Sequence, residues 1–495
     1  MLSLFIFFIG FMLFSSANWV VEKFGEVTYE QIMFHLNMPF SSEIRMIMSY
    51  IKNTVMTGAI IVVVLILFFG LKYRVHVKII DACRDWVRQK RLPLSLAWLA
   101  FCFVFVFFRM NVYNMITFHK YKTETSNFYE ENYVIPQQTK ITFPAHKRNL
   151  ILIFAESIEA TYAQTPLHDY FKADLIPGLH KLAKNNLHFS DNEYLGGSYE
   201  IDGTQWTQAG LFAQTCGAPI QLPINDPNWF HPKEGFFPKA WCLYDILRGQ
   251  GYVESFLIGS NGEFAGMDKF VETHGNQRLL DTNFYAERDG IDLSFEKTTK
   301  FLDKQVFAYA KEELANLSSQ DKPFVFTLMT LDTHYGTARF SDDVCERKYG
   351  SHNNIENVIS CSDKQITDFI SWLQQQEFYK DTVVVVLGDH LTMNKFFTKD
   401  MNRKPINIFI NSPVAAANTK NRVFTPFDIY PTIIESLGAK IDGHRLGLGT
   451  SLFSDMPTLT EGKMTVKDMD INVRKKSRLY DWMLYGKDVH ADDAP

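Results

Sequence analysis

The sequence predicts an α/β protein with a mostly parallel central sheet, preceded by a helical transmembrane anchor. From Asn149 onward, short continuous apolar runs alternate with helical stretches, which is the pattern of a parallel sheet covered on both faces. Three uncharged stretches lie within the first 108 residues, and each is about long enough to cross a bilayer core. With 495 residues, the chain has room for two or three ordinary domains.

Three membrane spans are predicted, at about 1–21, 53–71 and 92–108. The first stretch could instead be a cleaved signal peptide, but it lacks the basic start and the clear small-residue cleavage site of such peptides. The third stretch is the shortest, and its alternative is a buried core helix. We therefore expect residues 1–108 to form a transmembrane anchor.

Lysine and arginine are concentrated between the second and third spans. Seven of them lie in 72–91, whereas the loop before the second span holds only three, diluted by four glutamates. Because short cytoplasmic loops carry an excess of positive charge, 72–91 is predicted to be cytoplasmic and everything after Arg109 to be outside.

Four of the six cysteines fall in the predicted outside portion. Four cysteines allow three pairings, and an oxidising compartment permits disulfides. We favour Cys216 with Cys242 and Cys345 with Cys361, because both bridges would close modest loops inside one domain. Four unpaired thiols are the alternative.

Beyond the anchor, the chain divides by its periodicity. Residues 109–148 are polar and weakly periodic, and are predicted to be a linker; 149–460 would form the catalytic domain and 461–495 a C-terminal tail. Buried strands are predicted at 149–155, 253–258, 324–331, 382–387 and 406–410. Helices are predicted at 177–186, 240–249, 295–317, 355–376 and 427–437.

Chemically useful side chains follow the predicted strands directly. Glu156 follows the first strand, His334 follows the strand near 330, and Asp389 and His390 follow the strand near 387. A glutamate in such a place is more often a helix cap, and a lone histidine is more often structural. Ligands of parallel sheets, however, bind beyond the carboxyl ends of strands. Two carboxylates and an imidazole placed there together predict a site for Zn²⁺ or Mn²⁺.

A threonine-containing segment, Asp202 to Thr207, precedes what looks like a helix opening near Ala209-Gly210. A metal can deprotonate a hydroxyl, and helix N–H groups favour the anionic phosphate that it attacks. Attack would give a phospho-threonine intermediate, from which a second alcohol takes the phosphoryl group. His334 would protonate a departing alkoxide or bind the phosphate.

As an ordered set, these motifs resemble the alkaline phosphatase/sulfatase superfamily. They are most similar to the membrane-bound phosphoglycerol transferase I family of periplasmic glucan modification, and more distantly to lipoteichoic acid synthase. The matching segments are NLILIFAESIEATY at 149–162, DGTQWTQAGLFAQTCGAPI at 202–220, EFAGMDKFVETHG at 263–275, LDTHYG at 331–336, CSD at 361–363, GDHLTMN at 388–394 and DIYPTIIESLG at 428–438.

The resemblance implies roles for individual residues. Glu156, Asp389, His390 and Thr207 would hold the divalent metal, Mn²⁺ or Zn²⁺. Thr207 is the preferred nucleophile because its distance to the proline of the CGAP segment is nearer the pattern of related transferases, and Thr204 is the alternative.

Substrate contacts are implied as well. His334 matches a substrate-binding histidine, and Phe264 and Lys269 lie in the segment that matches a head-group-contacting loop. Lipoteichoic acid synthase has a tryptophan and an arginine in that loop, so this part of the pattern differs.

The expected function is transfer of phosphoglycerol from phosphatidylglycerol to a periplasmic glucan or other envelope glycan. The enzyme would be a multi-pass protein of the inner membrane, with its catalytic domain on the periplasmic side. The alternatives are phosphoethanolamine transfer, hydrolysis of a lipid head group, and a catalytically dead binding protein. Sulfatase activity is not expected, because no C/S-x-P-x-R motif is present. Net charge is −5, so no nucleic-acid footprint is visible.

Overall fold

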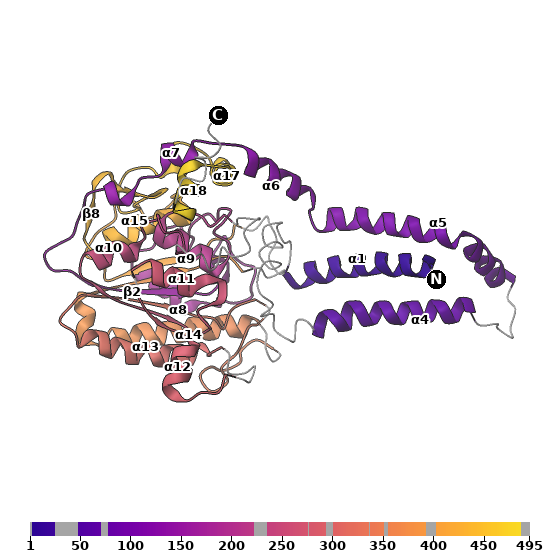
Figure 1. Cartoon of the computed structure of the whole chain (residues 1–495). Helices are drawn as coiled ribbons and strands as arrows, with labels where there is room; N and C mark the ends of the chain where they lie inside the picture. Colours follow the sequence, from indigo (N-terminus) through magenta and orange to yellow (C-terminus); the bar gives the residue numbers. More distant parts are fainter. Residues whose placement is uncertain are drawn as a thin grey trace. The chain divides into compact units, whose positions relative to one another are not determined.

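The computed structural model describes residues 2–24, 48–70, 78–221, 235–275, 277–293, 300–335, 337–350, 355–392 and 402–486. The chain divides into two compact units (Figure 1). Of the described residues, the N-terminal unit holds those up to Lys120, and the C-terminal unit holds those from Tyr121 onward.

A six-stranded sheet organises the C-terminal unit, in the order β4-β3-β5-β2-β6-β7. The strands are β2 (Asn149–Ala155), β3 (Val253–Ile258), β4 (Arg278–Leu280), β5 (Phe324–Met329), β6 (Thr382–Gly388) and β7 (Asn407–Ile410). All neighbours run parallel except β7, which is antiparallel to β6. Every residue of β5 and β6 is buried, as expected for strands covered on both faces. The predicted mostly parallel sheet is therefore confirmed.

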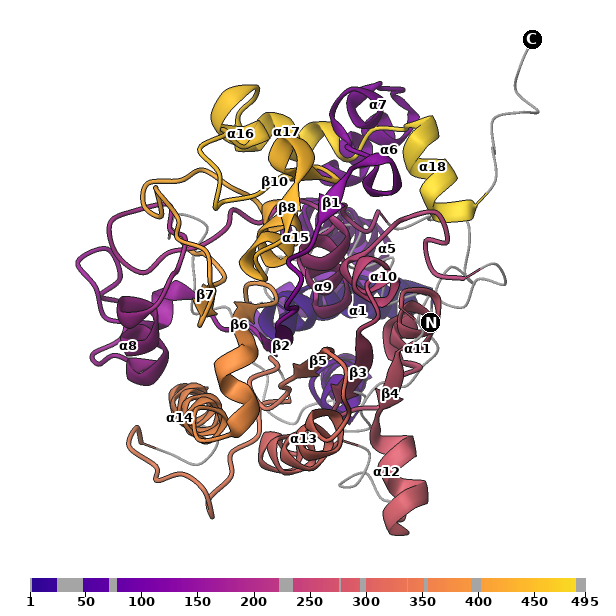
Figure 2. The same cartoon turned by 90° about the vertical axis from the view of Figure 1, so that its left-hand side faces the viewer.

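Helices cover both faces of this sheet (Figure 2). One face carries α9 (Thr207–Cys216), α10 (Leu243–Gly249) and α15 (Pro426–Ser436). The other carries α13 (Asp303–Ser318) and α14 (Ile355–Leu373), and α8 (Pro177–Asn185) packs beside α14. The shorter helices are α11 (Met267–Thr273), α12 (Thr282–Asp289), α16 (Leu459–Gly462), α17 (Val466–Asn472) and α18 (Arg478–Tyr485).

The segment predicted to be a linker carries several elements. They are α6 (Tyr113–Thr123), α7 (Phe128–Asn132), the 3₁₀ turn Pro136–Gln138 and β1 (Ile141–Thr142). β1 pairs with β8 (Lys440–Ile441). Tyr129 is buried, and its hydroxyl donates to the Val473 carbonyl at 2.9 Å. Residues 128–142 are thus packed into the C-terminal unit.

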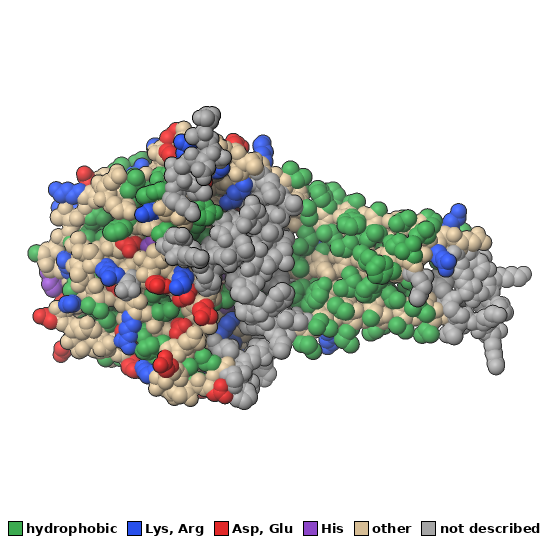
Figure 3. Space-filling view, viewed as in Figure 1, with side chains coloured by type: hydrophobic (Ala, Val, Ile, Leu, Met, Phe, Trp, Pro, Cys, Tyr) green, Lys and Arg blue, Asp and Glu red, His purple; other side chains and the backbone are tan. Residues whose placement is uncertain are grey.

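The N-terminal unit contains three helices long and apolar enough to cross a membrane, Leu2–Glu22, Met48–Leu67 and Gln89–Arg109. They lie in α1 (Leu2–Phe24), in a π-helical turn (Ile51–Met56) continued by α4 (Thr57–Gly70), and in α5 (Lys78–Arg109). Hydrophobic side chains cover their visible surface (Figure 3). α1 packs on α5: a Cβ on Gly10 would stand 2.7 Å from the Trp98 ring, so glycine permits the close approach.

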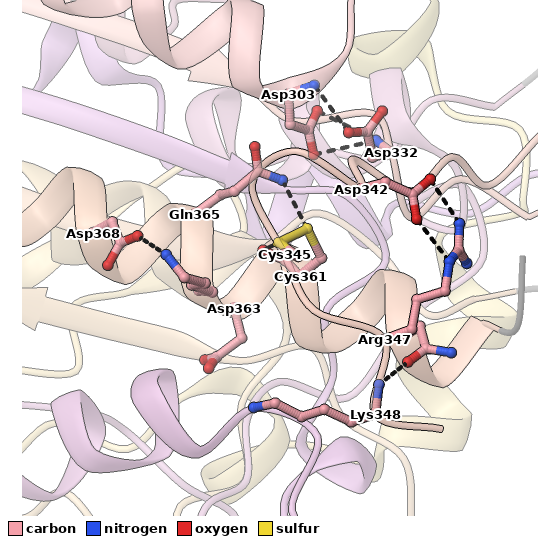
Figure 4. Close-up of a disulfide and its surroundings, with 12 residues drawn as sticks. Asp303, Asp332, Asp342, Cys345, Arg347, Lys348, Cys361, Asp363, Gln365 and Asp368 are labelled. Carbon is pink, nitrogen blue, oxygen red and sulfur yellow. Dashed lines mark hydrogen bonds and ion pairs between the residues drawn. A yellow bond between two sulfur atoms is a disulfide. The ribbon is translucent and has the colours of Figure 1, made fainter. Parts of the chain in front are cut away.

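Several predicted boundaries were wrong, for identifiable reasons. The helix expected at 295–317 begins at Asp303, because the Gln305 side chain accepts the Leu302 N–H and caps the start; 295–299 lie outside the described residues. The strand expected to reach Leu331 ends at Met329, because the N–H groups of 331 and 332 donate to the Asp303 carboxylate. Figure 4 shows Asp303 beside Asp332. β4, α11 and α12 were not predicted.

Candidate active site

Two neighbouring strands place the first pair of acidic side chains. In the register of β2 and β6, Ala155 pairs with Gly388, so the next residues, Glu156 and Asp389, leave the same edge of the sheet together. Glu156, Asp389 and His390 form the carboxylate–histidine cluster, whose ligand atoms lie within 4.8 Å of one another. All three are at most 5% exposed. The structure thus brings together three of the residues predicted to bind metal.

Ser157 connects the two strand ends. Its backbone N–H donates to Asp389 Oδ1 at 2.7 Å, and its hydroxyl donates to Glu156 Oε1 at 2.7 Å. To do so the backbone takes a left-handed conformation with φ 53°, which is costly for a residue with a Cβ. This strained turn holds both carboxylates in place.

Asp389 and His390 each keep one atom free toward the cluster. Asp389 Oδ1 accepts two backbone N–H groups, whereas its buried Oδ2 has no hydrogen-bond partner. His390 Nδ1 lies 2.9 Å from the Leu391 carbonyl. Since a carbonyl only accepts, Nδ1 carries a proton, and Nε2 is the nitrogen that would bind a metal once its own proton is displaced. Leu391 N–H is in turn held by Glu200 at 2.6 Å.

Thr207 joins the cluster from a different element. It is the first residue of α9, two residues earlier than the predicted opening at Ala209, because Trp206 is extended (φ −146°, ψ 161°). Thr207 Oγ1 lies 3.2 Å from Glu156 Oε2 and 3.4 Å from His390 Nε2. A Cβ on Gly210 would stand 2.1 Å from the Asp389 carbonyl oxygen, so only glycine lets α9 come this close.

Thr204, the alternative nucleophile, has a different environment. Its side chain is fully buried, and its hydroxyl donates to the Ile201 carbonyl at 2.7 Å and accepts the Ile201 N–H at 3.1 Å. Both bonds close a local turn. The structure therefore brings Thr207, and not Thr204, to the carboxylate–histidine cluster.

The spacing of the cluster fits one divalent ion. Two ligand atoms about 2.1 Å from a tetrahedral ion stand about 3.4 Å apart. Here His390 Nε2 lies 3.5 Å from Glu156 Oε1 and 3.4 Å from Asp389 Oδ2, close to the two Thr207 distances. Asp389 Oδ2, which has no hydrogen bond, and His390 Nε2 face each other across this space. Oxygen and imidazole donors suit Zn²⁺ or Mn²⁺.

The buried charges strongly influence one another. Burial, joined by the nearby Glu156 charge, raises the pKa of Asp389 to about 7. Burial alone would lower the pKa of His390, but Asp389 and Glu156 raise it to about 10. Burial would raise the pKa of Glu156, but His390 lowers it to about 2. Two carboxylates thus surround one imidazolium, and an entering cation would displace its proton.

His334 lies within electrostatic range of the cluster. Burial lowers its pKa, and the Glu156 carboxylate opposes that effect. Its Nδ1 faces the Tyr335 carbonyl at 3.0 Å, so Nδ1 carries the proton. No described residue hydrogen-bonds Nε2. The neutral ring therefore offers a lone pair toward a substrate.

Phe264 and Lys269 are not drawn into the cluster. Phe264 is 50% exposed, in the turn Phe264–Gly266 before α11. Lys269 Nζ pairs with Glu272 on the same helix, at 2.7 Å. Both side chains remain available at the surface.

The two predicted disulfides, Cys216–Cys242 and Cys345–Cys361, are both formed. The second joins the loop after His334 to α14, as Figure 4 shows. A second group with metal-ligand residue types is Cys242, Asp245 and His274. Cys242 is consumed by its disulfide and both His274 nitrogens are hydrogen-bonded, so this group is structural.

Sequence reasoning missed the groups that support the cluster. Gln214 donates to the carbonyls of Gly388 and Asp389 at 3.2 Å each. Glu159, fully buried, binds Arg403 through two bonds of 2.7 and 2.8 Å. Arg403 also donates to the Thr392 carbonyl at 2.7 Å, two residues beyond His390. The only signal for these residues in the sequence was that they lie near the segments predicted to form the site.

Residues 148–439 match the family described as Sulfatase. The chain belongs to the sulfatase family. Phosphoglycerol transferase I from Escherichia coli is 30% identical over 342 residues, which is 68% of this chain and 42% of that protein. The chain thus spans less than half the length of the curated relatives that it matches.

Solved structures agree on the fold of this family member. A protein of the alkaline phosphatase superfamily from Vibrio parahaemolyticus has a TM-score of 0.51 and 19% identity, covering 65% of this chain and 74% of that one. The integral membrane protein lipooligosaccharide phosphoethanolamine transferase A from Neisseria meningitidis has a TM-score of 0.51 and 12% identity. The match covers 95% of this chain and 87% of that one. At these identities the likeness shows the fold alone, which is alkaline phosphatase-like, as predicted.

Proposed function

We propose that this protein transfers phosphoglycerol from phosphatidylglycerol to a periplasmic glucan or another envelope glycan, through an intermediate on Thr207. The observation that carries the proposal is the Thr207 hydroxyl at the start of α9, 3.2 Å from Glu156 and 3.4 Å from His390. Similarity to phosphoglycerol transferase I supports the choice of head group.

The reaction proceeds in two displacements at one phosphorus. Thr207 Oγ1 attacks the lipid phosphate, the bond to the diacylglycerol oxygen breaks, and diacylglycerol leaves with the proton that Thr207 loses. A glycan hydroxyl then attacks, the bond to Thr207 breaks, and the acceptor's proton returns to Thr207. The free N–H groups at the start of α9 favour the anionic phosphate in both steps.

The surrounding residues have separate tasks. Glu156, Asp389 and His390 would hold Mn²⁺ or Zn²⁺, which supplies Lewis acidity and favours the threonine alkoxide. We assign to His334 Nε2 the task of carrying the proton of Thr207 to the departing diacylglycerol, and of carrying the proton of the acceptor hydroxyl back to Thr207. Phe264 and Lys269 are assigned to the head group.

The membrane anchor fits a lipid donor. Three apolar helices would keep the site near the bilayer and raise the effective concentration of head groups. The basic loop at 72–91 favours a periplasmic C-terminal unit of an inner-membrane protein. The two disulfides suit an oxidising compartment.

The test uses the full-length protein in vesicles that contain either phosphatidylglycerol or phosphatidylethanolamine, each labelled in its acyl chains. We expect labelled diacylglycerol from phosphatidylglycerol, with faster release when a glycan acceptor is present. Release from phosphatidylethanolamine alone would refute the head-group choice. Equal release without the acceptor would identify a phosphodiesterase, and release from neither lipid would refute the whole proposal.

A further inference from the structure

The residue after Thr207 is a glutamine whose buried carboxamide has no hydrogen bond among the described residues. Gln208 is 1% exposed, and neither Oε1 nor Nε2 of its carboxamide has a partner within the part of the chain that the structure describes. In contrast, Nε2 of Gln214, on the same helix, donates to the carbonyls of Gly388 and Asp389. Leaving a buried carboxamide unpaired costs folding free energy, so an unpaired one beside the proposed nucleophile calls for an explanation.

Helix geometry shows which side of α9 carries this side chain. Gln208 shares a face with Phe212, one turn later. Phe212 packs against Phe270 of α11, with ring centroids 6.3 Å apart. Because helical side chains tilt toward the N-terminus, the Gln208 carboxamide lies at the Thr207 end of α9, on the face that Phe212 shares.

The segment that precedes α11 is the turn Phe264–Gly266, already assigned to the head group. Ala265 in this turn is left-handed, with φ 57°, although it is not a glycine, and such strain gathers at ligand sites. Because Phe270 of α11 touches Phe212, this turn precedes the helix that packs against the Gln208 face of α9.

The chemistry of the carboxamide selects one kind of head group. A carboxamide offers N–H donors and a carbonyl acceptor at once. The hydroxyl groups of glycerol donate and accept, and so can use both. An ethanolammonium group carries a charge and only donates hydrogen bonds. It would leave the N–H groups of the Gln208 carboxamide unpaired, and a carboxylate would bind it better.

We propose that Gln208 hydrogen-bonds the hydroxyl groups of the transferred glycerol and selects a neutral polyol head group over an ammonium-bearing one. The inference rests on the proposed function and adds a specificity-determining residue to it. Bound phosphoglycerol would supply the partners that the carboxamide lacks in the free protein.

Two variants of the full-length protein test this in vesicles of the two lipids. Gln208→Met keeps the side-chain length and removes both polar atoms. We expect transfer from phosphatidylglycerol to fall by about 10- to 100-fold, with no fall in the thermal midpoint, because an unpaired buried group is removed. Gln208→Glu should raise the ratio of phosphatidylethanolamine to phosphatidylglycerol turnover at least about tenfold.

The matched control is Thr215→Val, two turns along the same buried helix, where the hydroxyl bonds only within α9, to the Leu211 carbonyl at 2.7 Å and near Cys216. It should keep both the rate and the lipid ratio of the wild type. If Gln208→Met does not fold, the ratio measured for Gln208→Glu decides alone, because a ratio does not depend on the amount of active protein.

Two results would overturn the inference. One is an unchanged lipid ratio in Gln208→Glu with near-wild-type transfer in Gln208→Met. The other is an equal loss on both lipids with a lowered thermal midpoint, which would make Gln208 structural. In either case, wild-type turnover of phosphatidylglycerol leaves the proposed function standing. A wild type that cleaves neither lipid refutes both.

Discussion

Thr207 Oγ1 lies 3.2 Å from Glu156 Oε2, although 51 residues separate them in the chain. The contact joins the carboxyl edge of the sheet to the first residue of α9. It depends on the glycine at position 210, which lets the helix reach the Asp389 carbonyl. The chemistry proposed for the site follows from this meeting of a carboxylate, an imidazole and a hydroxyl.

The two threonines should respond differently to loss of their hydroxyls. Thr207→Ala should reduce diacylglycerol release by at least about 10³-fold, because it removes the nucleophile. Thr204→Ala should lower the free energy of unfolding by about 1–3 kcal/mol, because it leaves the Ile201 backbone groups without their partner. Its remaining folded protein should still release diacylglycerol. Lipid turnover and urea denaturation of both variants measure this, and the reverse pattern would make Thr204 the nucleophile.

Metal affinity should fall as the pH falls. The pKa of Asp389 is raised to about 7 and that of His390 to about 10, so each binds a proton below those values. A metal must displace these protons. Affinity should therefore drop about tenfold per pH unit between pH 10 and 7, and more steeply below 7. Titration calorimetry with Mn²⁺ at several pH values checks this. A pH-independent affinity would show that His390 is not a ligand.

Gly210 should tolerate no side chain. In Gly210→Ala the new Cβ would stand 2.1 Å from the Asp389 carbonyl oxygen. Either α9 or the backbone at Asp389 must therefore move. We expect a loss of about 1–3 kcal/mol in stability, together with weaker metal binding. Gly249→Ala is the matched control, since nothing lies within 4 Å of its Cβ position. Equal behaviour of the two variants in thermal denaturation would contradict the close approach.

The buried ion pair next to the site should matter for stability. Arg403→Met leaves the Glu159 carboxylate, which is fully buried, without its partner at 2.7 Å. The expected loss in the free energy of unfolding is about 3–5 kcal/mol. Asp368→Asn breaks an exposed pair with Lys364 on α14 and should cost about 0.5 kcal/mol or less. Denaturant unfolding of the two variants measures both losses in free energy. Similar losses would contradict the burial of the ion pair between Arg403 and Glu159.

The strands and the cluster they carry could be predicted because buried parallel strands are continuous apolar runs. β2 and β6 are such runs, and Glu156, Asp389 and His390 follow them directly. β4 has three residues, one of them exposed, and gives no comparable signal. The antiparallel direction of β7 comes from its pairing with β6, which the sequence of a short apolar strand does not encode.

The sequence favoured Thr207 over Thr204 only through the family resemblance, because the position of each hydroxyl depends on where α9 begins. That start is set by extended backbone at Trp206 and by the tertiary contact of the glycine at 210. Likewise, the pair Arg403 and Glu159 joins residues 244 apart. The left-handed backbone of Ser157 is a property of the fold, not of the residue type.

The covalent intermediate offers the most direct test of the central claim. The full-length protein is mixed with phosphatidylglycerol labelled in its head group, without an acceptor, quenched in acid within the first turnover, and digested for mass spectrometry. The account predicts phosphoglycerol on the peptide that contains Thr207, and none on that peptide in Thr207→Ala. Diacylglycerol release with no labelled peptide, or a label on another residue, would contradict it.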